Sequence, residues 1–175
     1  MKDPTFIKRV FNLATAWRRK PEVGVTPADE VFAENKWRLL RYRARTEGAV
    51  YRTPILLVPS LINRHYVLDL MPGKSLVEWL VETGHDVFVI DWGTPSDEDR
   101  YLSFDEITGR YIGRALRQTC RISGSEKAHM LGYCLGGTLA AIHASAYPER
   151  VASLTSLAAP VSFEDDGLLA IWTRS

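Results

Sequence analysis

The most constraining feature of this sequence is the segment Gly-Tyr-Cys-Leu-Gly at residues 132–136. The preceding stretch, 128–133, predicts a short buried strand, and the Ala-rich stretch 135–147 predicts a helix. A strand that turns directly into a helix forces the residue at the turn into a strained backbone angle. Glycines two positions before and after that residue leave room for the turn. The pattern is therefore that of a nucleophile elbow, G-x-S-x-G, with Cys134 in place of serine.

The position of Cys134 predicts a reactive thiol. The free N–H groups and the positive end of the helix dipole point at its sulfur, and this field favours the nucleophilic thiolate. The alternative is a buried structural cysteine in a Gly-rich turn, but the flanking glycines and the Gly137-Thr138 continuation favour the elbow. The only other cysteine, Cys120, makes no disulfide framework and is interpreted as a helix-packing residue.

Strands and helices alternate along the rest of the chain. Strands are predicted over residues 53–59, 86–92, 128–133 and 151–158, and helices over 74–83, 103–121 and 135–147. Unbroken apolar runs such as 53–59 are typical of parallel strands buried on both faces. The alternation predicts an α/β protein with a mostly parallel sheet and helices on both faces.

Ligands of such sheets bind beyond the carboxyl ends of the strands. Four segments follow predicted strands there: Ser60–Asn63, Asp91–Gly93, Cys134 and Pro160–Phe163. We therefore expect these four segments to converge on one rim of the sheet.

The first part of the chain is predicted to be an amphipathic helix followed by a linker. Residues 5–19 carry an apolar stripe at helical spacing, and 21–27 reads as a linker, so we divide the chain into 1–27 and a core of 28–175. Docking of this amphipathic helix on its own core is favoured over a partner or a lipid-like surface. Residues 36–52 predict a strand or hairpin with a basic face, interpreted as solvated rather than as a lip for a phosphate-bearing substrate.

Composition limits the class of protein. A net charge of +1 argues against a dedicated nucleic-acid binder, and 46% hydrophobic residues suffice for a sizeable core. The start of the chain has no signal-peptide run, and the longest apolar runs are too short to span a bilayer. These features predict a cytoplasmic protein.

Three motifs resemble the polyhydroxyalkanoate synthases. Residues 59–70, Pro-Ser-Leu-Ile-Asn-Arg-His-Tyr-Val-Leu-Asp-Leu, are similar to the loop after strand three in that family. Residues 84–93 are similar to the next strand, and 132–138 are similar to the Cys-containing lipase box. The resemblance covers roughly residues 30–172, and the short N-terminal region is closer to the two-subunit synthases.

The resemblance implies an α/β-hydrolase fold and polymerisation of 3-hydroxyacyl-CoA, with Cys134 as the acylated nucleophile. It implies an oxyanion hole made by the backbone N–H of Leu135 and by that of Leu61 or Ile62. Coenzyme A enters only as the thioester substrate, so no cofactor and no metal are expected. The implied partners are the growing polyester, a second copy or second synthase subunit, and the surface of the polymer granule.

The acid and base of the fold should follow the nucleophile in the order acid, then histidine. The only later histidine, His143, lies nine residues on, about 13 Å along the helix, and is interpreted as a packing residue. His65 on the rim loop could approach Cys134, although an exposed loop histidine is the favoured interpretation. The other acid and histidine positions weighed are Asp165 and Asp166, possible acids without a matching histidine, and His85 and His129, expected to be structural.

These gaps lead to the expectation that the chain is an N-terminal fragment of a longer synthase, without turnover by itself. Two alternatives stay open. One is a cysteine-type α/β-hydrolase acting on an ester or lactone, against which the 59–70 motif speaks. The other is an inactive fragment that only packs on a partner, which the missing acid and histidine favour.

Overall fold

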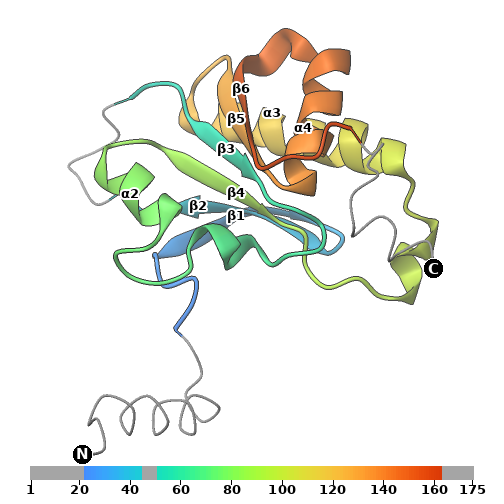
Figure 1. Ribbon diagram of the computed structural model, residues 1–175. Coiled ribbons are helices and arrows are strands. Elements are labelled where there is room, and N and C mark those ends of the chain that lie inside the picture. The colour runs from blue at the N-terminus through green and yellow to red at the C-terminus, as the bar shows by residue number, and fades with distance from the viewer. Residues whose placement is uncertain (1–21, 45–50, 163–175) are drawn as a thin grey trace, which may run out of the picture.

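The structure is a computed structural model that describes residues 22–44 and 51–162 (Figure 1). Its strands are β1 (Ala28–Glu34), β2 (Trp37–Tyr42), β3 (Ile55–Val58), β4 (Val87–Asp91), β5 (Ala128–Tyr133) and β6 (Val151–Leu157). Its helices are α2 (Leu76–Glu82), α3 (Ile112–Ser123) and α4 (Leu135–Ala146). The short turns are the 3-10 helices η1 (His65–Leu68), η2 (Asp97–Tyr101) and η4 (Pro148–Arg150), and the π-helical η3 (Glu106–Tyr111). The helix expected over 5–19, and Asp165 and Asp166, lie outside the described residues.

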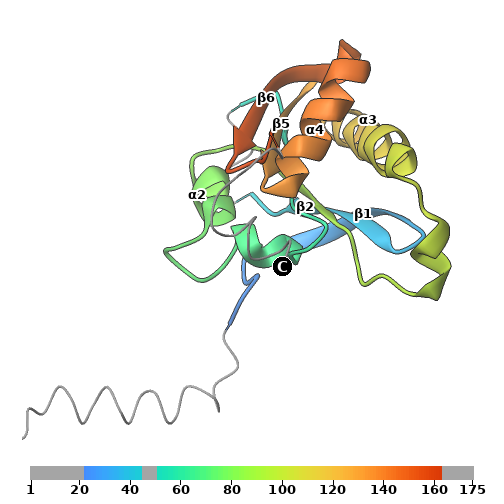
Figure 2. The same cartoon turned by 45° about the vertical axis from the view of Figure 1, so that its right-hand side comes forward.

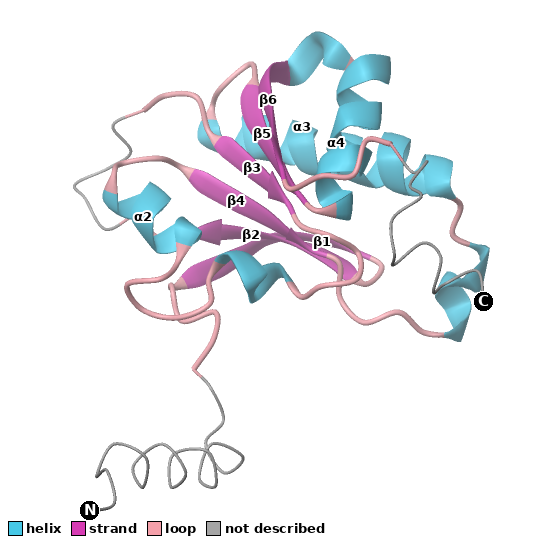
Figure 3. Cartoon of the chain, in the orientation of Figure 1, coloured by secondary structure: helices cyan, strands magenta, loops and turns pink. Residues whose placement is uncertain are grey.

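The six strands form one sheet in the order β1-β2-β4-β3-β5-β6. From β4 to β6 all neighbours are parallel, whereas β1 and β2 pair with their neighbours antiparallel. From β3 onward strands alternate with helices (Figure 3). The prediction of a mostly parallel α/β sheet is confirmed.

Each face of the sheet is covered by helices, and the covering residues explain why the central strands are apolar throughout. α2 lies on one face, whereas α3 and α4 lie on the other (Figures 1 and 2). On the α2 side, Val77 and Leu80 of the helix pack in one cluster with Leu57, Val87 and Val89 of the sheet. The opposite core includes Leu56, Phe88, Ile112, Leu116, Met130 and Leu139. Because alternate side chains of β3 and β4 enter different cores, every residue of both strands is buried.

The hairpin differs from its prediction. It pairs 28–34 with 37–42 around Asn35, whose φ of 52° the tight turn requires, and does not extend over 36–52. The sequence did not predict β1, because its residues are only partly buried or exposed and the alternation of apolar residues is therefore weak.

The basic face of β2 is not simply solvated. Arg38 pairs with Asp91 at 2.5 Å, and Arg41 makes two hydrogen bonds to Asp86 at 2.8 and 3.0 Å. These carboxylates sit on the neighbouring strand or at its start, so the arginines tie the antiparallel part of the sheet to the parallel part.

The helix predicted over 103–121 is split. Its capping box is present, since Ser103 N–H donates to Glu106 and Glu106 N–H donates to the Ser103 hydroxyl. The π-helical turn η3 then precedes α3, which ends at Gly124 in the left-handed conformation. Across the described ranges, no helix combines the length and hydrophobicity that a bilayer crossing demands.

Candidate active site

Cys134 occupies the sharp turn between β5 and α4. Its φ of 53° and ψ of −132° are strained for a residue with a side chain, and it caps the first turn of α4. Its N–H donates to the Leu157 carbonyl at 2.9 Å, and its carbonyl accepts from Gly137 N–H at 2.8 Å. The thiol is partly exposed. The backbone on both sides of Cys134 is therefore held by hydrogen bonds while its side chain stays accessible.

The two flanking glycines are required by direct contact. A Cβ on Gly132 would lie 2.4 Å from the Gly137 Cα, and a Cβ on Gly136 would lie 2.1 Å from the Val58 carbonyl oxygen. Neither contact can relax through a flexible side chain, because both involve backbone. The elbow geometry expected from the glycine spacing is present.

The loop after β3 lies against this elbow. A Cβ on Gly136 would also come within 2.6 Å of Pro59, which begins that loop. The buried Ser60 accepts a hydrogen bond from Ile62 N–H at 3.1 Å, and the Ile62 side chain is 82% exposed. Leu61, in contrast, packs on the core. The Ile62 N–H is thus already engaged, whereas that of Leu61 forms no hydrogen bond with the described residues.

The predicted rim forms. Trp92, after β4, donates its indole N–H to the Pro59 carbonyl at 2.9 Å. Thr138, in α4, donates to the Pro160 carbonyl beyond β6 at 2.6 Å. Segments after β3, β4, β5 and β6 therefore meet around Cys134, as expected for the described part of the four segments.

Comparison with known proteins agrees with this geometry. Residues 53–173, more than half of the chain, match the family model described as the alpha/beta hydrolase fold. The chain belongs to the alpha/beta hydrolase fold family. Residues 14–80 also match the model for the N-terminus of poly-beta-hydroxybutyrate polymerase, PhaC.

The relatives of this alpha/beta hydrolase are polyester polymerases. It is 46% identical to the poly(3-hydroxyalkanoate) polymerase subunit PhaC of Haloferax mediterranei, over 83% of the chain and 29% of that protein. It is 40% identical to the subunit of the same name from Synechocystis sp., over 94% of the chain and 43% of that protein. The chain thus spans less than half the length of these relatives.

A solved structure of a thioesterase domain from the curacin biosynthetic pathway shares the fold. Its TM-score is 0.59 at 16% identity, with 85% of this chain and 50% of that chain covered. At this identity the likeness concerns the fold alone.

In an alpha/beta hydrolase the nucleophile is activated by a later histidine, and the structure shows that His143 is not placed for this role. His143 is 3% exposed, and its Nδ1 lies 2.7 Å from the Thr108 carbonyl. Burial lowers the pKa of His143 below its ordinary value. It packs α4 against η3, as the sequence interpretation held.

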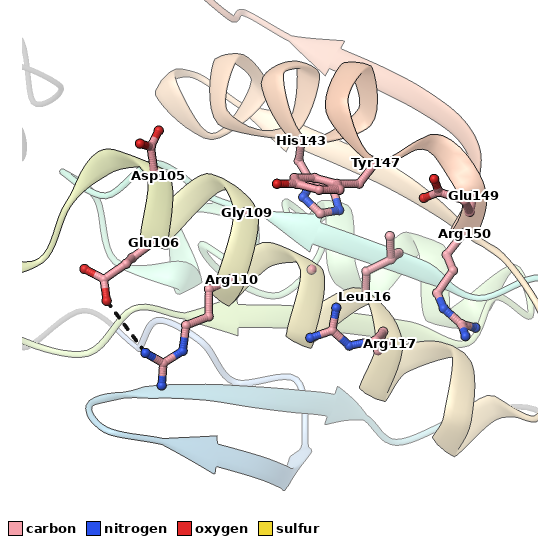
Figure 4. A pocket seen from close by; sticks show the side chains of 11 residues that line it. Asp105, Glu106, Gly109, Arg110, Leu116, Arg117, His143, Tyr147, Glu149 and Arg150 are labelled. Atoms are coloured by element: carbon pink, nitrogen blue, oxygen red, sulfur yellow. Dashed lines mark ion pairs between the residues drawn. The ribbon is translucent and has the colours of Figure 1, made fainter.

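The pocket beside His143 does not contain Cys134. It has a volume of about 700 Å³ and lies between η3, α3 and the end of α4 (Figure 4). Its charged lining residues are Arg110, Arg117 and Arg150 together with Asp105, Glu106 and Glu149. The charges balance, and Arg110 already pairs with Glu106 at 3.6 Å, so the pocket offers no excess charge to a ligand.

His65 differs from its prediction as an exposed loop residue. Its side chain is 21% exposed, and its Nδ1 lies 3.3 Å from a carboxylate oxygen of Asp91, without hydrogen-bond alignment. The His65 ring, followed by Gly93 N–H and the Arg38 guanidinium, holds the pKa of Asp91 below its usual range. The sequence placed Asp91 at the rim but gave no sign of these partners, which come from three separate segments.

The remaining histidines and cysteine have structural roles. His85 stacks on Tyr51 with ring centroids 4.3 Å apart, and His129 Nδ1 lies 2.7 Å from the Ser153 hydroxyl. Cys120 is 2% exposed in α3. These placements agree with the packing and structural roles expected from the sequence.

Proposed function

We propose that this chain carries the nucleophile of a poly(3-hydroxyalkanoate) polymerase and that Cys134 takes up the acyl group. The observation that carries the proposal is Cys134 at φ 53° between β5 and α4, in a chain 46% identical to a polymerase subunit. An elbow presents its nucleophile at the carboxyl edge of the sheet, where substrate can reach it.

The chemistry favours a thiol at this position. The Cys134 thiolate attacks the carbonyl carbon of a 3-hydroxyacyl-CoA, and coenzyme A leaves as its thiolate, so one thioester replaces another. The hydroxyl of a second acyl unit then attacks the enzyme thioester. A base takes the hydroxyl proton, an oxoester forms and the Cys134 sulfur is released. All atoms come from enzyme and substrates, so the reaction needs no cofactor.

The oxyanion formed in each attack needs two donors. We propose the backbone N–H of Leu135, at the start of α4, where amides have no intrahelical acceptor. For the second donor we propose Leu61 rather than Ile62, because the Ile62 N–H already donates to Ser60.

The base and the partners are part of the same proposal. Within the described residues after β5, 134–162, His143 is the only histidine, and its Nδ1 faces the Thr108 carbonyl. We therefore do not assign the role of the base to His143. A growing polyester, a second copy or second subunit, and a polymer granule surface are the partners that this activity would require.

The test is to incubate the purified protein with 3-hydroxybutyryl-CoA and locate the acyl group by peptide mass spectrometry. Acylation is expected on Cys134, with one coenzyme A released for each acyl group bound. Cys134→Ala should abolish it, whereas Cys120→Ala should retain it, because Cys120 is buried away from the rim. Acyl groups on Cys120, or unchanged acylation of Cys134→Ala, would refute the proposal.

A further inference from the structure

A smaller pocket lies on the α3 face of the sheet, beside the loop proposed for the oxyanion hole. Its volume is about 220 Å³, and its apolar walls include Leu61, Trp92, Leu102 and Ile107. Two of these walls belong to the rim, since Leu61 follows Ser60 and Trp92 donates to the Pro59 carbonyl at 2.9 Å. The pocket therefore shares a wall with the loop that lies against the Cys134 elbow.

Two polar groups in this lining have a hydrogen to donate. Trp37 is 2% exposed, and its indole N–H finds no acceptor in the part of the chain that the structure describes. The Tyr111 hydroxyl accepts from the Asn35 amide at 2.8 Å, so its own hydrogen is left to donate. The Trp37 and Tyr111 rings lie 5.8 Å apart. Buried donors are normally paired, so the unpaired Trp37 indole N–H, beside a Tyr111 hydroxyl that can still donate, indicates a ligand with an acceptor.

The charged residues of the lining are already satisfied. Lys36 pairs with Asp99 at 2.9 Å, and both line the pocket. The backbone around them is fixed, because a Cβ on Gly93, at φ 74°, would lie 2.3 Å from the Lys36 carbonyl oxygen. This close approach clamps the loop after β4 onto the β1–β2 turn. The pocket is thus formed by fixed backbone segments and offers neutral donors rather than a free charge.

We propose that this pocket is a subsite for a neutral ester or thioester acyl group. The aliphatic part would lie on the apolar walls, and the carbonyl oxygen would accept hydrogen bonds from Trp37 and Tyr111. Pockets for drug-sized ligands measure about 300–1,000 Å³, so this one suits a single short hydroxyacyl unit and not a nucleotide. The inference rests on the proposed function, because it assigns the pocket to the acyl part of that reaction.

The probe is methyl 3-hydroxybutyrate, an ester of one such unit, titrated into protein labelled with ¹⁵N at the indole nitrogens. The chain has five tryptophans, so the Trp37 signal can be assigned from its loss in Trp37→Phe. A saturable shift of the Trp37 indole proton is expected. The matched ether 4-methoxybutan-2-ol lacks the carbonyl and should bind about ten- to a hundredfold more weakly, the loss expected for two net hydrogen bonds.

Variants separate this subsite from non-specific binding. Leu102→Trp fills the pocket and should abolish the shift, whereas Leu70→Trp, at an exposed leucine outside it, should leave the shift unchanged. Tyr111→Phe removes only the hydroxyl and should weaken ester binding about three- to tenfold without changing ether binding. This second variant decides the matter if Leu102→Trp does not fold.

Three results would overturn the inference: no saturable shift, equal binding of ester and ether, or an unchanged shift in a folded Leu102→Trp. Equal binding of ester and ether would mean that the pocket is only an apolar cavity. The absence of a shift would mean that an ordered water holds the Trp37 indole N–H and that the ester does not displace it. Ester binding is measured apart from acylation. Binding without acylation of Cys134 would refute the proposed function alone, whereas acylation without binding would refute the subsite alone.

Discussion

Gly136 of α4 lies directly against the carbonyl of Val58 at the end of β3: a Cβ at Gly136 would be 2.1 Å from that oxygen. This contact joins the first turn of α4 to the start of the loop that we propose for the oxyanion hole. It sets the spacing between Cys134 and Leu61, on which the proposed chemistry depends.

Gly136→Ala is therefore expected to lower the free energy of unfolding by about 3 kcal/mol or more, because the added methyl group would clash with backbone and either β3 or α4 would have to shift. Gly124→Ala is the control. Gly124 has a positive φ but open space around it, so it should cost only about 1–2 kcal/mol. Urea denaturation compares the two variants, and equal losses would contradict the steric argument.

Ser60→Ala should slow acylation of Cys134 more than it lowers stability. Loss of the Ser60 hydroxyl frees the Ile62 N–H and loosens the loop that positions Leu61. The acylation rate is expected to fall by about 10²-fold, the lower range for a lost oxyanion donor, with a stability loss of about 1 kcal/mol. Stopped-flow release of coenzyme A measures the rate. Ser145→Ala, which removes an exposed hydroxyl bonded to the Ala141 carbonyl, should leave the rate unchanged.

Asp91 should stabilise the fold above about pH 4 and lose this contribution in acid. Its pKa is depressed in the folded protein, so the unfolded chain takes up the proton first as the pH falls below its ordinary value of about 3.9. Asp91→Asn is expected to lose up to about 3 kcal/mol at pH 6 and about 1 kcal/mol less than that at pH 3, because each pH unit below the ordinary pKa removes about 1.4 kcal/mol of the contribution. Asp97→Asn alters an exposed carboxylate that forms no ion pair within the described part of the chain, and should show no such difference. Denaturation at both pH values makes the comparison.

His143 should make the fold less stable just below neutral pH. Burial lowers its pKa, so the unfolded chain binds a proton near pH 6.5 that the folded His143 resists, and stability falls as the pH drops. His143→Gln should remove this slope between pH 7 and 5.5. His85, whose pKa burial also lowers, is present in both proteins and cancels in the comparison. At pH 7 the variant should be about 1–3 kcal/mol less stable, since the Thr108 carbonyl loses a well-placed donor. An identical slope in both proteins would contradict this assignment.

The local pattern of the sequence determined the elbow, the strand alternation and the position of Cys134 at the turn. The reason is physical: Gly132, Gly136 and the apolar runs of β3 and β4 each meet a requirement of nearby backbone, which short stretches of sequence express directly. The hairpin was misplaced because β1 owes its position to pairing with β2 and to ion pairs across strands rather than to an apolar pattern of its own.

Only the tertiary structure decided which groups meet at the rim and in the interior. It engaged Ile62 N–H with Ser60, brought His65 and Arg38 to Asp91, and gave the Trp37 indole no acceptor within residues 22–44 and 51–162. Each of these contacts involves a particular side chain or a neighbouring strand that is far away in the sequence. Its energy depends on interatomic distances in the folded chain, which the periodicity of the sequence does not specify. The sequence marked Cys134 at the elbow, and the packing of the sheet decided which groups surround it.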